Sequence, residues 1–215
     1  MFIAFEGLDG SGLSTHSRLL VKWLNSRGYR AVYTKEPTPH SPLSSIIRDY
    51  LARPEPLDDL LALLFAADRI WHLQEDPRLP GGGILGALSS GFIVVCDRYK
   101  YSSIAYQGSG VGIEWVEMVN LRARDADLIL YLDVPVEVAY KRASMRGRRE
   151  VYEAADRMRR IKEVFDEVLK RAESRGVNVA RIQGVDASGG ERSIEDVQGE
   201  IRSVVLRFIA GLERR

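Results

Sequence analysis

The stretch FEGLDGSGLST, residues 5–15, follows a short apolar run and carries glycines at positions 7, 10 and 12. Gly7 and Gly12 lie five residues apart, and the hydroxyl residues Ser14 and Thr15 follow. Glycines let the backbone turn tightly enough for several N–H groups to face one phosphate, and the N-terminus of a following helix adds positive potential. The stretch therefore predicts a strand, a phosphate-binding loop and a helix that begins near Leu13.

One position departs from the usual pattern of such a loop. The pattern G-x-x-x-x-G-K-S places a lysine directly before the hydroxyl residue, and here that position holds Leu13. Leucine cannot donate a charge-assisted hydrogen bond to a phosphate. The backbone cradle does not need that side chain, so nucleotide binding is expected to suffer less than turnover. Because one stabilising arginine is worth about 10³–10⁵ in rate in related systems, a working enzyme needs arginines from elsewhere.

Size and composition fit a single α/β domain over residues 1–215. The chain is 45% hydrophobic and has a formal net charge of +1, which allows a sizeable core and gives no general attraction to nucleic acid or an anionic membrane. The single cysteine, Cys96, excludes an internal disulfide, and its apolar neighbours predict a buried thiol. The first residues show neither a basic leader nor a membrane-length apolar run, so we expect a cytoplasmic location.

Strand patterns alternate with helical patterns along the chain. Five apolar, β-branched runs are predicted as strands, at residues 1–6, 29–34, 92–97, 128–134 and 178–183. Helical patterns occupy most of the intervening chain, at residues 16–28, 57–76, 135–147, 153–175 and 193–211. Most of the strands are apolar on both faces, as strands of a covered parallel sheet must be. The alternation predicts a three-layer α/β sandwich around a five-stranded parallel sheet.

Further motifs follow the glycine-rich loop in a fixed order. They are EP at 36–37, LLFAADR at 63–69, DRYKYSSIAYQG at 97–108, LYLDVPVEVAYKR at 130–142 and VDAS at 185–188. In this order and spacing the chain resembles the thymidylate kinase family, and the most specific motif is the one at 97–108. The resemblance covers nearly the whole chain. It implies a P-loop nucleoside monophosphate kinase fold, transfer of a phosphoryl group from ATP to dTMP with Mg²⁺, and a homodimer.

The loop and the end of the third strand supply the predicted phosphate and metal ligands. Asp97 and Arg98 stand at the carboxyl edge, where open α/β sheets bind ligands. Asp97 with Ser14 would hold Mg²⁺ and Arg98 would bind the acceptor phosphate, although an ion pair closing the strand is an alternative. Asp9 resembles the family's carboxylate near the acceptor phosphate, or is a turn-forming residue. The predicted ATP-phosphate site comprises Gly7, Gly10, Ser11, Gly12, Leu13, Ser14 and Thr15.

The resemblance also implies a set of dTMP-binding residues. Phe65 would stack on thymine and Arg69 would bond to the base or the acceptor phosphate, whereas by themselves the two side chains fit a core position and a solvated charge. Ser103 matches a base-binding position, and Tyr106 an aromatic residue below the sugar. The predicted set comprises Glu36, Phe65, Arg69, Arg98, Ser103, Tyr106 and Gln107.

The replacement charge for Leu13 is predicted in the basic segment KRASMRGRREVYE, residues 141–153. A dense cluster of arginines around a glycine suits a mobile lid near 142–153 that closes over phosphates, although charge runs are often solvated surface. The family's lid often has Asp-Arg-aromatic-Glu, whereas this chain has Glu150 to Glu153 with valine in place of arginine. The catalytic lid arginine is therefore sought upstream, among Arg146, Arg148 and Arg149.

Two alternatives to a thymidylate kinase stay open. One is a kinase for another nucleoside monophosphate or for a deoxynucleoside. The other is a nucleotide-binding protein with little or no turnover, which the leucine at position 13 would suit. A GTPase switch is disfavoured because the chain lacks an Asn-Lys-x-Asp base-reading motif. The adenine contacts are weakly marked, with segment 185–192 as a candidate wall, and His16, His40 and His72 are interpreted as structural or surface residues.

Overall fold

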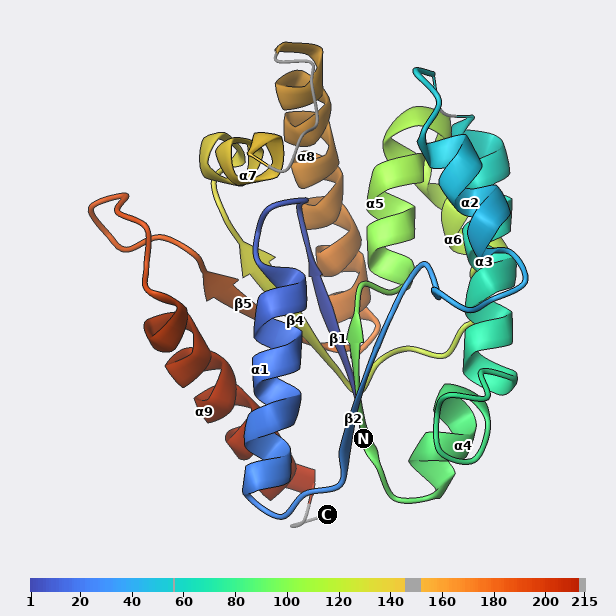
Figure 1. Ribbon diagram of the computed structural model, residues 1–215. Coiled ribbons are helices and arrows are strands. Elements are labelled where there is room, and N and C mark those ends of the chain that lie inside the picture. Colours follow the sequence, from blue (N-terminus) through green and yellow to red (C-terminus); the bar gives the residue numbers. More distant parts are fainter. Residues whose placement is uncertain (56, 146–151, 213–215) are drawn as a thin grey trace.

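The computed structural model describes residues 1–55, 57–145 and 152–212 and forms a five-stranded parallel sheet with helices on both faces (Figure 1). The strand order is β2-β3-β1-β4-β5. The strands are β1 (Phe2–Gly7), β2 (Ala31–Lys35), β3 (Ile93–Asp97), β4 (Leu128–Asp133) and β5 (Asn178–Gln183). The predicted parallel sheet is confirmed, with strand bounds close to those expected.

The helices build the two outer layers. On one face α1 (Leu13–Ser26) and α9 (Ile194–Leu212) pack against the sheet over a core that includes Phe5, Leu20 and Ile201. On the other face α3 (Asp58–Gln74), α5 (Lys100–Val111) and α8 (Tyr152–Ser174) enclose a second core. The remaining helices are α2 (Ser44–Leu51), α4 (Gly83–Ser89), α6 (Ile113–Val119) and α7 (Val136–Ser144). The three-layer sandwich predicted from the sequence is therefore confirmed.

The sheet brings the predicted site together at its carboxyl edge. In the register of the sheet, Phe5 of β1 pairs with Asp97 of β3, and Gly7 pairs with Leu132 of β4. The loop after β1 therefore lies between the end of β3 and the start of α7. The packing is close, since a Cβ added to Gly10 would lie 2.1 Å from the carbonyl oxygen of Ala139 in α7. Only glycine fits there, and φ at Gly10 is +87°.

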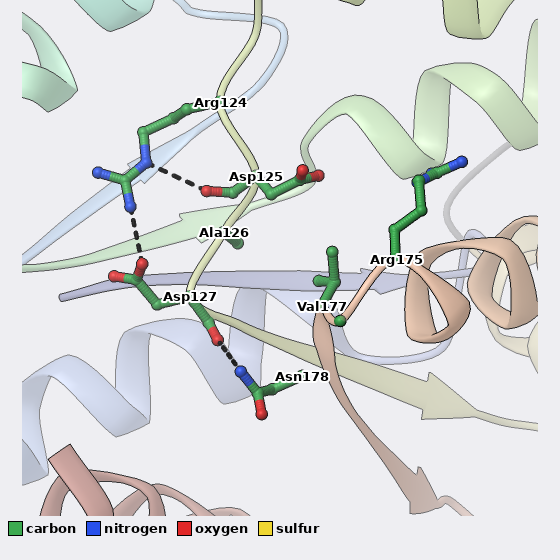
Figure 2. Close-up of a pocket in the computed structure, with 8 residues that line it drawn as sticks. Arg124, Asp125, Ala126, Asp127, Arg175, Val177 and Asn178 are labelled. Atoms are coloured by element: carbon green, nitrogen blue, oxygen red, sulfur yellow. Dashed lines mark hydrogen bonds and ion pairs between the residues drawn. The ribbon is translucent and has the colours of Figure 1, made fainter. Parts of the chain in front are cut away.

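The opposite edge of the sheet carries a shallow polar pocket in which charges pair with one another. Figure 2 shows Arg124 reaching both the carboxylate of Asp127, at 2.7 Å, and the backbone carbonyl of Asp125, at 3.1 Å. Asn178 donates to the carbonyl oxygen of Asp127 at 3.1 Å and so ties β5 to the start of β4. These contacts close the amino ends of the strands. Among the described residues, no helix is both long and apolar enough to cross a membrane.

Candidate active site

The glycine-rich loop forms an open cradle between β1 and α1. Gly10 and Gly12 have φ of +87° and +100°, in the left-handed region that glycine adopts without strain. The Ser11 N–H donates to the Leu8 carbonyl at 3.1 Å and closes the turn. The buried Ser11 hydroxyl has no hydrogen-bond partner among the described residues. A glycine-rich turn that leads directly into the N-terminus of α1 is the backbone arrangement that phosphate sites use.

Leu13 begins α1 and points into the protein. Its side chain is 5% exposed and packs in the same core as Ile3, Phe5 and Leu20. The leucine therefore acts as a core residue at the base of the cradle. The sequence showed the missing lysine but could not show that the replacing side chain is buried.

Ser14 and Asp97 place two oxygen ligands next to the cradle. The exposed Ser14 hydroxyl donates to Asp97 Oδ2 at 2.5 Å, and the Tyr33 hydroxyl donates to the same oxygen at 3.2 Å. Burial, followed by the charge of Asp97, raises the pKa of Tyr33, so this phenol stays a donor. The structure thus brings the two predicted metal ligands into direct contact, from elements far apart in the sequence.

Arg98 lies across the cradle and is held by three acceptors. Its guanidinium donates to the Gly7 carbonyl at 2.9 Å, the Ser102 hydroxyl at 3.0 Å and Asp9 Oδ1 at 2.7 Å. The Tyr106 ring lies beneath the guanidinium, 5.1 Å from its carbon, and the Tyr106 hydroxyl accepts from the Asp9 N–H at 2.8 Å. Arg98 therefore joins the glycine loop to α5, and the predicted residues Asp9, Arg98 and Tyr106 form one contiguous group.

Glu36 and Arg69 form a buried ion pair below this group. Arg69 approaches Glu36 Oε2 with two nitrogens, at 2.7 and 2.8 Å, and also donates to Asn120. Glu36 Oε1 lies 3.2 Å from His72, whose other ring nitrogen is 2.6 Å from the Thr34 hydroxyl. The two predicted residues are thus joined to each other, and a direct contact of either with a nucleotide stays a prediction.

The three remaining dTMP-binding candidates lie on α3 and α5. Phe65 is half-buried on α3, four residues before Arg69. Ser103 and Gln107 are buried one turn apart on α5, and the Ser103 hydroxyl donates to the Gln107 side-chain oxygen at 3.1 Å. The structure places Ser103 and Gln107 on the same helix as Tyr106, and their roles toward a base stay predictions.

Folding also gathers a metal-like group that the sequence did not reveal. The ligand atoms of Glu36, His72 and Cys96 lie within 4.8 Å of one another. Burial raises the pKa of the Cys96 thiol well above its usual value, which disfavours the thiolate that metal binding needs. Glu36 and His72 are already engaged in the ion pair and hydrogen bonds just described. The three residues come from distant segments, so no spacing in the sequence could indicate them.

A second hollow adjoins the cradle, between α1, α7 and the segment after β5. Its polar lining includes Thr15, His16, Arg142 and Arg192, and Leu132, Val134, Ile182, Ile194 and Val197 are among its apolar residues. Arg142 forms an ion pair with Glu191 at 2.7 Å, which links α7 to that segment. Gly184, directly before the predicted adenine wall at 185–192, and Arg192, its last residue, line the hollow.

The histidines fit their sequence interpretation, whereas the role of the predicted lid arginines stays a prediction. His16 and His72 are buried and hydrogen-bonded, and His40 is exposed, as expected for structural or surface residues. His16 in addition lines the second hollow, a contact the sequence did not suggest. Arg146, Arg148 and Arg149 lie outside the described residues. Within the basic segment, Arg142 is the arginine that lies among the described residues.

The chain matches known proteins along almost its whole length. The family model for thymidylate kinase matches residues 5–201. The chain belongs to the thymidylate kinase family. A protein of Aeropyrum pernix named "putative thymidylate kinase" is 49% identical over 213 residues, which cover 99% of this chain and 98% of its own. Thymidylate kinases named "probable" from Pyrococcus horikoshii and Pyrobaculum aerophilum are 37% and 36% identical, with coverage of 97% or more on both sides.

The residues that carry the resemblance to the thymidylate kinase family lie together in the fold. The glycine loop, the DRY sequence at 97–99 and the buried α5 motif are the parts that resembled this family in the sequence, and folding brings them into contact. Sequence reasoning did not find Glu6, a fully buried carboxyl that contacts Ser102 and the Tyr99 backbone. A charged residue inside an otherwise apolar strand, in FIAFEG, is the signal that could have indicated it.

Proposed function

We propose that the chain transfers the γ-phosphoryl group of ATP to dTMP and produces dTDP and ADP. The observation that carries the proposal is the convergence of Ser14, Asp97 and Arg98 at the mouth of a glycine cradle, in a thymidylate kinase chain. The cradle would hold the ATP phosphates through the backbone N–H groups of the glycine-rich loop and the N-terminus of α1. The hollow beside it, with apolar walls and the planar guanidinium of Arg142, is the proposed place of the adenine base.

The oxygen ligands of Ser14 and Asp97 fit Mg²⁺. A hydroxyl and a carboxylate 2.5 Å apart are hard donors of the type this ion prefers, and the exposed Ser14 leaves room for phosphate oxygens and water. An ion held there would supply positive charge that neutralises the phosphate groups. Tyr33 also donates to Asp97 Oδ2 and so helps to hold this carboxylate in place.

The side chains of the site act through position and charge. An oxygen of the dTMP phosphate is itself the nucleophile and is already ionised, so no strong general base is needed. Arg98 would bind this phosphate, and Asp9 and Tyr106 keep the guanidinium between the cradle and α5. Catalysis then rests on alignment of the two phosphates and on neutralisation of the charge that develops between them.

The positive charge missing at Leu13 is proposed to come from the segment 142–153, acting as a lid. Arg142 is the arginine of this segment that lies within the described residues, and it lines the hollow beside the cradle. Arg146, Arg148 and Arg149 are the proposed catalytic arginines and lie outside the described residues. Single replacement of each by glutamine, with Arg207 on the outer face of α9 as a matched control, identifies which one lowers kcat.

We also propose a homodimer, as the family resemblance implies. Exposed apolar side chains lie on or directly beside three helices, α2, α3 and α6, of which α3 contacts both of the others (Figure 1). They are Leu51, Leu57, Leu63, Met118 and Leu121, of which Met118 is 63% and Leu121 77% exposed. A second copy covering this surface would remove them from water. A cytoplasmic location stays a prediction.

The deciding experiment incubates the purified chain with ATP and saturating Mg²⁺, together with dTMP, dUMP, other monophosphates or thymidine, and detects the phosphorylated product directly. The proposal expects dTDP as the main product. Arg98→Gln should lower the rate by about 10²-fold or more, as loss of a phosphate-neutralising arginine does, whereas Arg207→Gln should not. Preference for another acceptor would favour the related-kinase alternative. Binding of ATP and dTMP without any product would favour a nucleotide-binding protein.

A further inference from the structure

Glu6 is a buried carboxyl that the proposed chemistry does not use. It lies near the end of β1 with no exposure, directly before the glycine loop. Its Oε1 accepts from the Tyr99 N–H at 3.1 Å, and its Oε2 is in a short hydrogen bond with the Ser102 hydroxyl. Both partners follow Arg98 closely along the chain, one and four residues later. A buried carboxyl with two such contacts calls for a role, because burying it costs free energy.

The backbone at Arg98 needs support. Among the described residues Arg98 is the one non-glycine residue with φ in the left-handed region, at 70°. Such a conformation is strained for a residue with a side chain and persists only where surrounding contacts fix it. The Arg98 N–H donates to Phe5, and the Arg98 carbonyl accepts from the Cys96 thiol, both at 3.0 Å. Glu6 fixes the next peptide group.

Ser102 extends this contact to the side chain of Arg98. Its hydroxyl lies between Glu6 Oε2 and the Arg98 guanidinium, which donates to it at 3.0 Å. The Ser102 oxygen accepts from the guanidinium, and its hydrogen bond with Glu6 Oε2 can run in either direction, with Ser102 as the donor to an ionised Glu6 or as the acceptor from a protonated one. The three groups therefore form a continuous chain in both states. Glu6 is therefore connected to Arg98 indirectly in two ways, through the backbone of Tyr99 and through the side chain of Ser102.

Charges around Glu6 come from several elements. Arg98 and Cys96 face it from the end of β3, Arg69 from α3 and Glu36 from the segment after β2. Tyr131 is its register partner in β4. Among the described residues Glu6 forms no direct ion pair with either arginine, since Arg69 is joined to Glu36 and Arg98 to Asp9. Desolvation by burial outweighs the neighbouring arginines and raises the pKa of Glu6 to about 8.

We propose that Glu6 is a positioning residue: as an uncharged acid it holds Arg98 in its strained conformation and leaves the guanidinium charge available for the acceptor phosphate. An ionised Glu6 would hold the same turn, but its negative charge would partly neutralise the Arg98 guanidinium, to which Ser102 connects it. The inference rests on the proposed function for its kinetic consequence and on the fold alone for its protonation state.

The first test compares the native chain with Glu6→Gln, which keeps an acceptor for Tyr99 and a donor for Ser102 without any charge. At pH 7 the two should have kcat/KM for dTMP within about threefold, since matched hydrogen bonds differ by well under 1.4 kcal/mol. The KM for dTMP of the native chain should rise as pH passes about 8, and that of Glu6→Gln should stay flat. Tyr106 does not interfere, because burial raises its pKa to about 12.

The second test needs no turnover. Unfolded Glu6 ionises near its ordinary pKa of 4.5, whereas folded Glu6 keeps its proton to about pH 8. Unfolding of the native chain therefore releases a proton across this range, so its free energy of unfolding falls relative to that of Glu6→Gln as pH rises. The difference levels off above pH 8. Urea unfolding of both chains at a series of pH values measures it, and a constant difference overturns the uncharged acid.

The positioning role is tested by Glu6→Ala and Ser102→Ala. Each should raise the Kd for dTMP by about tenfold, the equivalent of one lost hydrogen bond of about 1.4 kcal/mol, and Glu6→Gln should restore native binding. If Glu6→Ala does not fold, Ser102→Ala decides alone, because it breaks only the side-chain route. Unchanged dTMP binding in the folded alanine variants overturns the role. If the native chain itself binds no dTMP, the proposed function fails, while the urea measurement still judges Glu6.

Discussion

At the scale of single residues, the buried environment of Leu13 limits what a lysine at this position could restore to the phosphate cradle. Its side chain packs among Ile3, Phe5 and Leu20, so an ammonium group introduced there begins in a hydrophobic core. A lysine must extend its stem past the loop to reach water or phosphate. The residue that looks like a missing catalytic group in the sequence is a packing residue in the fold.

We therefore expect Leu13→Lys to raise kcat by less than about tenfold. The same substitution should lower the Tm by several degrees, because it buries a charge at a core site. Leu13→Met is the matched control, since it conserves volume and costs little. Steady-state kinetics and thermal unfolding of both variants measure these effects. A gain of several hundredfold from lysine would mean that no other cation compensates for Leu13 in the native chain.

His16 gives the fold a sensitivity to acid. Burial, aided by the charge of Arg142, lowers its pKa from 6.5 to about 4, and Gln198 donates to its Nδ1 at 2.9 Å. Between pH 6.5 and 4, His16 is protonated in the unfolded chain and neutral in the folded one. The free energy of unfolding therefore falls as pH falls through this window. The loss is on the order of 3 kcal/mol, at about 1.4 kcal/mol per pKa unit.

His16→Asn keeps an acceptor for Gln198 and has no titrating ring. We expect its free energy of unfolding to depend less on pH between 6.5 and 4 than that of the native chain. Chemical unfolding at pH 7, 5.5 and 4.5 measures the difference. Equal slopes in the two chains would show that the folded histidine takes up its proton as readily as an unfolded one.

At the scale of elements, the ion pair between Arg142 and Glu191 joins α7 to the segment after β5. Both side chains are partly exposed, at 31% and 45%, so the pair contributes little to stability, about 0–1 kcal/mol. Its position matters more, because Arg142 lines the hollow beside the phosphate cradle. A carboxylate there opposes the approach of an anionic nucleotide.

Glu191→Gln should accordingly lower the KM for ATP by a few fold at low ionic strength, with a smaller effect in high salt, where exposed charges are screened. The Tm should hardly change. Glu195→Gln, which alters another exposed acid at the start of α9, is the matched control. Kinetics at two salt concentrations decide the matter, and a raised KM would indicate that Glu191 instead holds Arg142 in its binding position.

The elements also show where sequence reasoning succeeded and where it stopped. All five strands were predicted, because apolar runs such as FIVVC are hard to place anywhere but in a covered parallel sheet. Helix α5 was recognised as a motif and not as a helix, since Gly108 and Gly110 weaken its helical pattern. Contacts such as Glu6 with Ser102 or Glu36 with Arg69 join residues 96 and 33 positions apart, and only the sheet register brings them together.

At the scale of the whole molecule, the exposed apolar surface on α2, α3 and α6 bears on assembly. An apolar surface of this kind on neighbouring helices is typical of a protein–protein interface. We expect sedimentation analysis to show a dimer for the native chain, and Leu63→Lys to shift it toward the monomer. Leu206→Lys on α9, which also replaces an exposed leucine, should leave the dimer intact. A native monomer, or equal disruption by both substitutions, would remove the proposed interface.

The place of β1 in the sheet has a consequence for how the protein loses its ligand-binding ability. β1 is hydrogen-bonded on one side to β3 and on the other to β4, and the cradle grows directly from its last residue. Amide protons of such an inner strand exchange with solvent mainly through global opening. Gradual heating should therefore leave nucleotide affinity nearly intact until the sheet unfolds. Nucleotide binding and the folded sheet should then be lost together in one cooperative transition.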